Sequence, residues 1–116
     1  MKQPVLVTAA WPYANAFIHV GNLSGAYLPA DIFARYQRLK GRDTLFVSGT
    51  DAHGTPITVR ADDEKTTPEV IYKRYHESFL DMQQKVGISY DLFTSTHTEN
   101  HFKVSQDIFL ALQENG

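Results

Sequence analysis

The sequence predicts an α/β domain built on three parallel strands joined by crossover helices. Short apolar runs at residues 4–8, 44–48 and 90–95 are typical of buried strands. Segments with helical spacing follow each run, and this alternation indicates a parallel sheet with right-handed crossovers. Three such strands make half of a doubly wound fold.

The first strand is expected at residues 4–8, a valine-rich run whose composition predicts burial on both faces. Residues 9–18 contain proline and asparagine and are predicted to form a loop. Helical spacing then extends over residues 21–40. Pro29 lies within that helix, where its ring meets the carbonyl group of Gly25, so we expect a kink or a helix start delayed to this point.

Three threonines mark the remaining helix starts. Thr55 and Thr67 each offer an N-cap hydroxyl before a proline. Thr96, with a glutamate three residues on, has the form of a capping box. The helix after Thr67 carries an apolar stripe and is expected to close at Gly87, and the last helix runs on to Gly116.

The composition excludes several classes of protein. A length of 116 residues suits a single domain, and a net charge of −2 gives no global attraction to nucleic acid. The absence of cysteine excludes a disulfide framework and a thiolate zinc site. We expect a cytoplasmic protein with no membrane segment, because no apolar run approaches the ~20 residues that a spanning helix needs and no secretory signal is evident.

The predicted first loop ends in a short pattern with chemical potential, residues 19–22 (HVGN). A helix N-terminus presents free N–H groups that suit phosphate. His19 there can donate to a phosphate oxygen, and Gly21 leaves room for a flat base. Taken alone, the pattern also fits a histidine that caps a structural turn.

Longer stretches resemble the methionyl-tRNA synthetases, a family of class I aminoacyl-tRNA synthetases. PYANAFIHVGN (residues 12–22) resembles that family's His-Ile-Gly-His motif, and GTDAHGTP (residues 49–56) resembles its second-strand turn. With ISYDLFTSTHTEN (residues 88–100), the resemblance spans residues 5–116. It implies the N-terminal half of a Rossmann-like (HUP-type) fold. The implied activity is that of a methionine–tRNA ligase, which activates methionine with ATP to methionyl-adenylate and transfers it to tRNA(Met).

The resemblance also implies roles for individual residues. His19 and Asn22 would be catalytic and, with Asn15, would contact the phosphates of ATP, while Gly21 would lie against adenine. The whole set implied to bind ATP is Pro12, Tyr13, Asn15, His19, Gly21 and Asn22. The set implied to bind methionine is Ala10, Trp11, Tyr13, Asp51 and His53. Asp51 would hold the ammonium group, since a cationic amine in a partly dry cleft needs a carboxylate partner.

Structural alternatives stand beside these roles. Asp51 also fits a plain turn in which its side chain bonds the backbone. Trp11 and Tyr13 also fit core aromatics, although Pro12 between them favours an exposed loop. Two departures from the family pattern are Asn22, where a second histidine is usual, and Trp11, where leucine is frequent; the indole would narrow the methionine pocket or swing aside.

Other polar residues carry no expected chemistry. His76 is expected to be structural. His97 and His101 lie four residues apart with no third ligand evident, so no metal site is expected. A local basic group is expected to be a solvated face rather than an RNA site, and it consists of Arg35, Arg38, Lys40 and Arg42.

The family's other parts are not found in these residues. They are the Lys-Met-Ser-Lys-Ser-type loop, the connecting insertion with its zinc, the second half of the fold and the anticodon-binding domain. We therefore expect residues 1–116 to be a fragment, the N-terminal half of the catalytic domain. It would bind L-methionine and ATP with Mg²⁺ only partially and would not charge tRNA(Met) alone. An exposed sheet edge would favour self-association.

Two other functions remain open at this point. A small adenylyl- or nucleotidyltransferase also attacks an α-phosphorus, but it needs a Gly-x-Phe-Asp-Pro type of first loop, which WPYANAFI does not match. A non-catalytic synthetase-derived binding module would keep the fold without the reaction.

Overall fold

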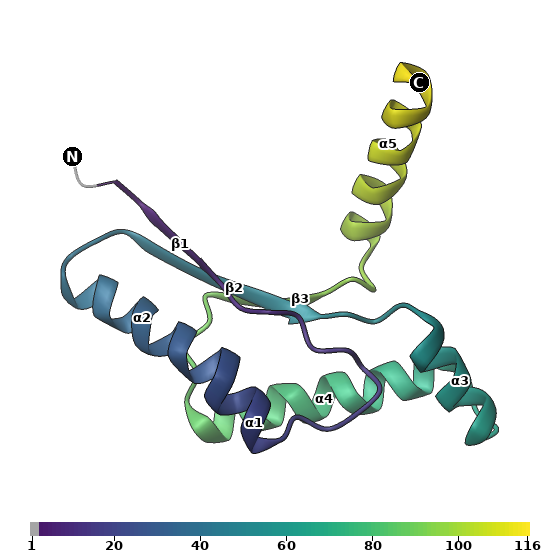
Figure 1. The fold of residues 1–116 in the computed structure, drawn as a ribbon, viewed down its shortest axis with the longest axis horizontal. Coiled ribbons are helices and arrows are strands. Elements are labelled where there is room, and N and C mark those ends of the chain that lie inside the picture. The colour runs from purple at the N-terminus through teal and green to yellow at the C-terminus, as the bar shows by residue number, and fades with distance from the viewer. Residues whose placement is uncertain (1–2) are drawn as a thin grey trace.

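A computed structural model describes residues 3–116 as a three-stranded parallel sheet with helices packed on one face (Figure 1). The strands lie in the order β1-β2-β3. They are β1 (Val5–Thr8), β2 (Thr44–Thr50) and β3 (Leu92–Ser95). Val5 pairs with Thr44 and Val47 pairs with Leu92, both in parallel register. The predicted α/β class and parallel strands are confirmed.

The helices also follow the predicted order. They are α1 (Val20–Asn22), the π-helix η1 (Leu23–Tyr27), α2 (Leu28–Leu39), α3 (Thr55–Asp63), α4 (Pro68–Val86) and α5 (Glu99–Asn115). One predicted helix, residues 21–40, is thus three consecutive segments. Within residues 3–116, no helix combines the length and the apolarity needed to cross a membrane.

The π-helix resolves the conflict posed by Pro29. The N–H of Leu28 donates to the carbonyl of Leu23, five residues back, so the turn before the proline is wider than an α-turn. The wider turn relieves the contact between the proline ring and the preceding backbone. Regular α-helix begins at Leu28, as the prediction of a delayed start requires.

Only one of the three threonine caps is placed as predicted. Thr67 caps α4 by accepting a hydrogen bond from Val70 N, and Gly87 closes that helix in the left-handed conformation at φ 72°. The cap of α3 is Gly54 rather than Thr55, which is the first residue of the helix, so that prediction was wrong.

The predicted capping box at Thr96 was also wrong. Thr96 Oγ1 accepts a hydrogen bond from Ala52 N at 2.8 Å, so its hydroxyl joins β3 to the turn after β2. Thr98 caps α5 instead, accepting from His101 N at 3.2 Å. The Thr96 hydroxyl therefore bonds a residue distant in sequence instead of capping the helix.

The sheet is buried on one face only. Val7 and Phe46 point toward the helices and belong to a cluster with Ala34 of α2. On the opposite face Leu6 is 64% exposed and Leu45 is 52% exposed. The expectation that the first strand is buried on both faces was therefore wrong, because no element of residues 3–116 covers this second face (Figure 1).

Two arginines of the predicted basic face hold the fold together. Arg38 reaches Asp91 and Ser89, with an ion pair of 2.7 Å to Asp91. Arg35 donates to the Gly87 carbonyl and to Asp31. These contacts join α2 to the segment before β3. Arg35 is exposed, as expected of a solvated face, whereas Arg38 is half-buried, so the expectation was wrong for Arg38.

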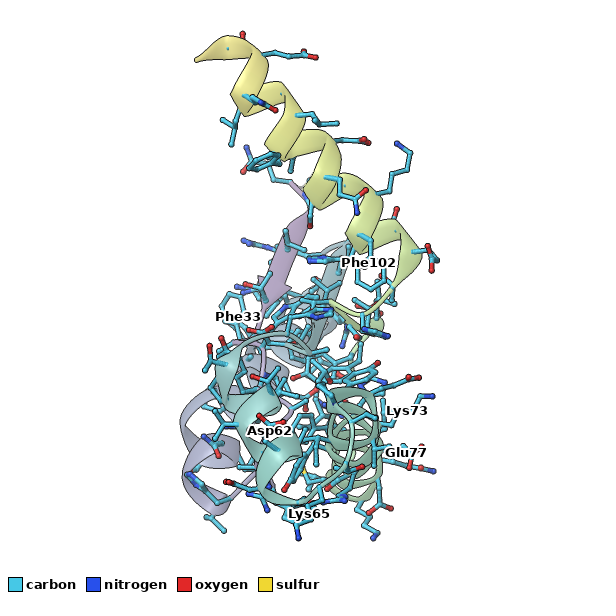
Figure 2. The ribbon with its side chains drawn as sticks, turned by 90° about the vertical axis from the view of Figure 1, so that its right-hand side faces the viewer. Phe33, Asp62, Lys65, Lys73, Glu77 and Phe102 are labelled. Carbon is cyan, nitrogen blue, oxygen red and sulfur yellow. The ribbon has the colours of Figure 1, made fainter. Side chains whose placement is uncertain are left out.

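The last helix stands away from the rest of the molecule. In both views α5 projects from the sheet, with Phe102 near its base (Figures 1 and 2). None of its residues is buried. Its apolar side chains are accordingly exposed, including Ile108, Phe109 and Leu112.

Candidate functional site

The two loops that follow β1 and β2 are bonded directly to one another. Asp51 N donates to the Pro12 carbonyl at 2.9 Å, and Ala14 N donates to the Asp51 carbonyl at 3.0 Å. Tyr13 and Asp51 thereby form an isolated parallel bridge. The two loops therefore pack together, and the first loop extends the sheet.

Two aromatic residues of the first loop lie against glycines, one in β2 and one in the loop that follows it. A Cβ at Gly49 would lie 2.7 Å from two ring carbons of Trp11, and one at Gly54 would lie 3.4 Å from the Tyr13 ring. Trp11 is 40% exposed and Tyr13 is 47% exposed. These side chains are therefore loop residues on a glycine surface rather than core aromatics.

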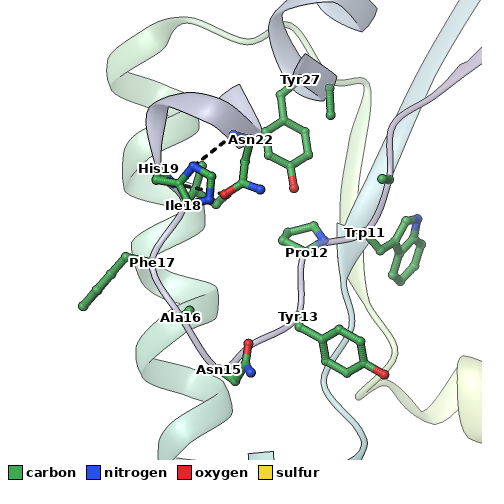
Figure 3. A pocket seen from close by; sticks show the side chains of 12 residues that line it. Trp11, Pro12, Tyr13, Asn15, Ala16, Phe17, Ile18, His19, Asn22 and Tyr27 are labelled. Carbon is green, nitrogen blue, oxygen red and sulfur yellow. Dashed lines mark hydrogen bonds between the residues drawn. The ribbon is translucent and has the colours of Figure 1, made fainter. Parts of the chain in front are cut away.

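A cavity of about 410 Å³ lies between the first loop and the helical turns that follow it (Figure 3). It is lined by Ala10, Trp11, Pro12, Tyr13, Asn15, Ala16, Phe17, Ile18, His19, Asn22, Ala26 and Tyr27. The structure thus brings together seven of the ten residues expected to bind ATP or methionine. Gly21, Asp51 and His53 do not line it.

His19 and Asn22 form a reciprocal cap at the start of α1. His19 Nδ1 accepts from Gly21 N at 3.1 Å and from Asn22 N at 3.3 Å, while Asn22 Oδ1 accepts from His19 N at 3.2 Å. The helix N–H groups that we expected to be free for phosphate are therefore occupied. Because Nδ1 accepts, the neutral ring carries its proton on Nε2, and the Asn22 amide keeps its NH₂ group. Both side chains retain donors for a ligand.

A contact that we did not predict explains why position 21 is a glycine. A Cβ at this position would lie 2.9 Å from Cε1 of His19. The imidazole folds back over Gly21 in order to cap the helix, and any side chain there would displace it. Glycine therefore makes the capped arrangement possible.

No acidic side chain and no lysine or arginine belongs to the described lining of the cavity. Its polar groups are the amides of Asn15 and Asn22, the imidazole of His19, the indole of Trp11 and the hydroxyls of Tyr13 and Tyr27. The cavity offers hydrogen-bond donors without a fixed positive charge.

Asp51 lies beside the cavity, at the end of β2, and is half-buried. Within residues 3–116, no hydrogen bond or ion pair engages its carboxylate. The alternative in which the Asp51 side chain bonds the backbone of a plain turn is therefore not observed. His53 is exposed and its ring contacts His97 at 5.3 Å and Phe102 at 5.7 Å. Its neighbours belong to the base of α5 rather than to the cavity.

His76 is structural, as expected. Its Nδ1 lies 2.8 Å from Thr50 Oγ1 at the end of β2, and its ring contacts Tyr72 and Phe93. Burial lowers the pKa of His76, which favours the neutral ring. The contact with Thr50 helps to fix the backbone that carries Asp51.

Comparison with known proteins decides the family. The family model described as tRNA synthetases class I (M) matches residues 5–116. The chain belongs to this family of class I synthetases. Methionine–tRNA ligases of Roseiflexus sp. strain RS-1 and of Thermomicrobium roseum are each 59% identical to it over 116 residues, which is all of this chain and 20% of each relative. The synthetase chain thus spans about a fifth of the length of the curated relatives it matches.

Solved structures show the same relationship. Mycobacterium tuberculosis methionyl-tRNA synthetase in complex with methionyl-adenylate superposes with a TM-score of 0.89 at 31% identity, covering 98% of this chain and 22% of that one. A second structure of that enzyme, bound by methionyl-adenylate, gives a TM-score of 0.83 at 34% identity over 87% of this chain and 20% of that one. The half-domain of a Rossmann-like class I synthetase fold is thereby confirmed.

Five lining residues of this synthetase cavity were not among the expected site residues. Ala16, Phe17 and Ile18 belong to the first loop, whereas Ala26 and Tyr27 come from the π-helix. On an α-helix, five residues make about 1.4 turns, which would place Tyr27 away from the face of Asn22. The π-turn changes this phase, and no local sequence signal other than Pro29 marks it.

Proposed function

We propose that this chain is the part of a methionine–tRNA ligase that binds ATP and methionine. The single observation that carries the proposal is the gathering of the first-loop residues around one cavity, beside the free carboxylate of Asp51. Similarity over the whole chain to methionine–tRNA ligases supports the same conclusion. The rival nucleotidyltransferase has no such support.

In the complete enzyme the reaction has two steps. A carboxylate oxygen of methionine bonds to the α-phosphorus of ATP as the bond to pyrophosphate breaks, giving methionyl-adenylate. A hydroxyl of the terminal adenosine of tRNA(Met) then takes the methionyl group and AMP leaves. The protein contributes mainly positioning and stabilisation of the charge that develops on phosphate oxygens.

The donors left over from the helix cap suit the first step. The Nε2–H of His19 and the NH₂ of Asn22 point away from bonds already made to the backbone. We assign both, with Asn15, to the phosphate oxygens. Pro12, Tyr13 and Gly21 would bound the rest of the nucleotide.

Methionine would bind on the side of Asp51. The free carboxylate is half-buried, so an ammonium group there gains an ion pair shielded in part from water. Ala10, Trp11 and Tyr13 would form the wall for the thioether side chain, because Tyr13 forms the bridge with Asp51 and the other two come shortly before it. We assign His53 to the support of this wall through its ring contacts.

The neutral lining predicts weak binding of ATP by this chain alone. A triphosphate placed in the cavity finds donors but no lysine or arginine to balance its charge. Residues 3–116 also contain no group of three or more histidine, cysteine, aspartate or glutamate side chains placed to hold a metal ion. They do not fit a protein-held Mg²⁺ or zinc site, so no step is assigned to either ion here.

The proposed role carries three further expectations. The complete enzyme binds tRNA(Met) through surfaces outside these residues, since the net charge of this chain is −2. A role in translation places it in the cytoplasm. The exposed face of the sheet favours self-association of this chain when it is alone.

Calorimetry with the 116-residue chain tests the proposal. We expect weak binding of ATP and tighter binding of a non-hydrolysable methionyl-adenylate analogue. Asp51→Asn should weaken the analogue by about 10–100-fold, because it removes a charge-assisted bond to the ammonium group, and should leave ATP unchanged. Asp107→Asn on α5 is the control. A non-catalytic binding module would give no heat of binding with either ligand. That result would overturn the proposal.

A further inference from the structure

Tyr27 places a hydroxyl in the cavity from an otherwise buried side chain. The residue is 5% exposed, and it belongs to the core cluster with Val7, Ala9 and Phe46. It also lines the cavity, and Figure 3 shows its ring beside Asn22 with the hydroxyl directed into the space toward Pro12. The ring thus anchors in the core while its polar end reaches the site.

That hydroxyl is unpartnered. Within residues 3–116, no hydrogen bond engages it, although the side chain is more than nine-tenths buried. The oxygen itself is not one of the buried polar atoms that lack a partner, because it faces the open cavity. A hydroxyl that faces the cavity and makes no hydrogen bond within residues 3–116 is free to donate to a ligand bound there.

The hydroxyl keeps its proton in this setting. Burial raises the pKa of Tyr27, so the group remains neutral and acts as a donor. The neighbouring polar groups on this side of the cavity are the NH₂ of Asn22 and the Nε2–H of His19, which are donors as well. A ligand that satisfies all three must present several oxygen acceptors close together, as a nucleotide does with its phosphates and ribose.

We propose that the Tyr27 hydroxyl donates a hydrogen bond to an oxygen atom of the bound nucleotide, as a third donor beside Asn22 and His19. This inference rests on the proposed function, because it assigns a further residue to the same ATP site. The wide π-turn is what delivers the residue to this position, five residues after Asn22. Functional sites are a frequent location of such turns.

Tyr27→Phe tests the inference, because it deletes the hydroxyl and keeps the ring in the core. We expect the affinity of the 116-residue chain for ATP, measured by calorimetry, to fall about tenfold. The thermal unfolding midpoint without ligand should stay unchanged, since the hydroxyl faces the cavity and makes no hydrogen bond within residues 3–116. A residue that only packs would not combine weaker binding with unchanged stability.

Tyr90→Phe is the matched control. Its hydroxyl is buried, and Tyr90 does not line the cavity, so removal of this hydroxyl should not affect a ligand there. Its ring packs on Phe46 at 4.3 Å, as a core residue does. The affinity of this variant for ATP should stay within twofold of the wild-type value.

Binding of adenosine, which has the ribose but no phosphate, shows which oxygen of the nucleotide Tyr27 contacts. If Tyr27 meets the ribose, Tyr27→Phe weakens adenosine and ATP alike; if it meets a phosphate, only ATP is weakened. Both outcomes support the inference. If the wild-type chain binds ATP and Tyr27→Phe binds it with the same affinity, this inference alone is overturned. If the wild-type chain binds neither ATP nor the methionyl-adenylate analogue, the proposed function is overturned together with it.

Discussion

The indole ring of Trp11 lies on the backbone of Gly49, at a separation that leaves no room for a side chain. A Cβ built at Gly49 would lie 2.7 Å from Cη2 and Cζ3 of the indole and 2.9 Å from the Thr94 carbonyl oxygen. The ring that we assign to the methionine wall is therefore positioned by the absence of a side chain on β2. Its place on the sheet is set by two strands distant from it in sequence, β2 and β3.

Gly49→Ala should displace Trp11 and destabilise the domain by about 1–3 kcal/mol, because the new methyl group overlaps both the ring and Thr94. Trp11 is the only tryptophan, so its fluorescence emission maximum reports the movement and urea unfolding reports the stability. Gly25→Ala is the control, since nothing lies within 4 Å of its added methyl group. Emission and stability unchanged from wild type would show that the contact is not formed.

His19 has two roles that substitution can separate. His19→Ala removes the cap acceptor and should lower the free energy of unfolding by about 0.5–2 kcal/mol, whereas His19→Asn keeps an acceptor oxygen and should retain most of it. Neither variant keeps the Nε2–H, so in a complete enzyme containing these residues both should lower ATP–pyrophosphate exchange by about 10²–10³. Exchange by His19→Asn within threefold of wild type would exclude the phosphate contact.

Predictions succeeded where the signal was local. Thr67 before a proline and Gly87 after an apolar stripe mark both ends of α4, because capping depends on the adjacent backbone. The loop of residues 9–18 was likewise evident from its proline and asparagine. These features need no partner elsewhere in the chain.

Predictions failed where a distant partner or a change of helical phase decided the outcome. Thr96 has a capping pattern, but Ala52 takes its hydroxyl. Tyr27 reaches the cavity only because η1 is a π-helix, and α-helical spacing cannot place it there. The pattern at His19 correctly located a helix start, yet it gave no sign that the imidazole itself would occupy the N–H groups expected to bind phosphate.

Leu45→Lys should reduce self-association of the chain. Leu45 is 52% exposed on the uncovered face of the sheet, where it pairs with the exposed Leu6, and a second copy would bury both. Sedimentation velocity across a concentration series should show association of the wild type and a monomer for the variant. Val59→Lys on α3 is the control, since Val59 is equally exposed at 52%. A wild-type chain that stays monomeric at all concentrations would contradict the prediction.

Asp31→Asn should destabilise the domain by about 1.5–3 kcal/mol at pH 7, since charge-assisted bonds from Ser89 and Arg35 are lost. Burial alone would raise the pKa of Asp31, but these bonds together hold it below 3.8. A lowered carboxyl pKa stabilises the fold above the unfolded value, and this contribution disappears as the pH falls below about 4. Urea unfolding across that range should therefore show a steeper acid loss for wild type than for Asp31→Asn. Asp107→Asn, at an exposed ion pair on α5, should change stability by no more than about 0.5 kcal/mol; equal effects of the two substitutions would show that the Asp31 bonds do not stabilise the fold.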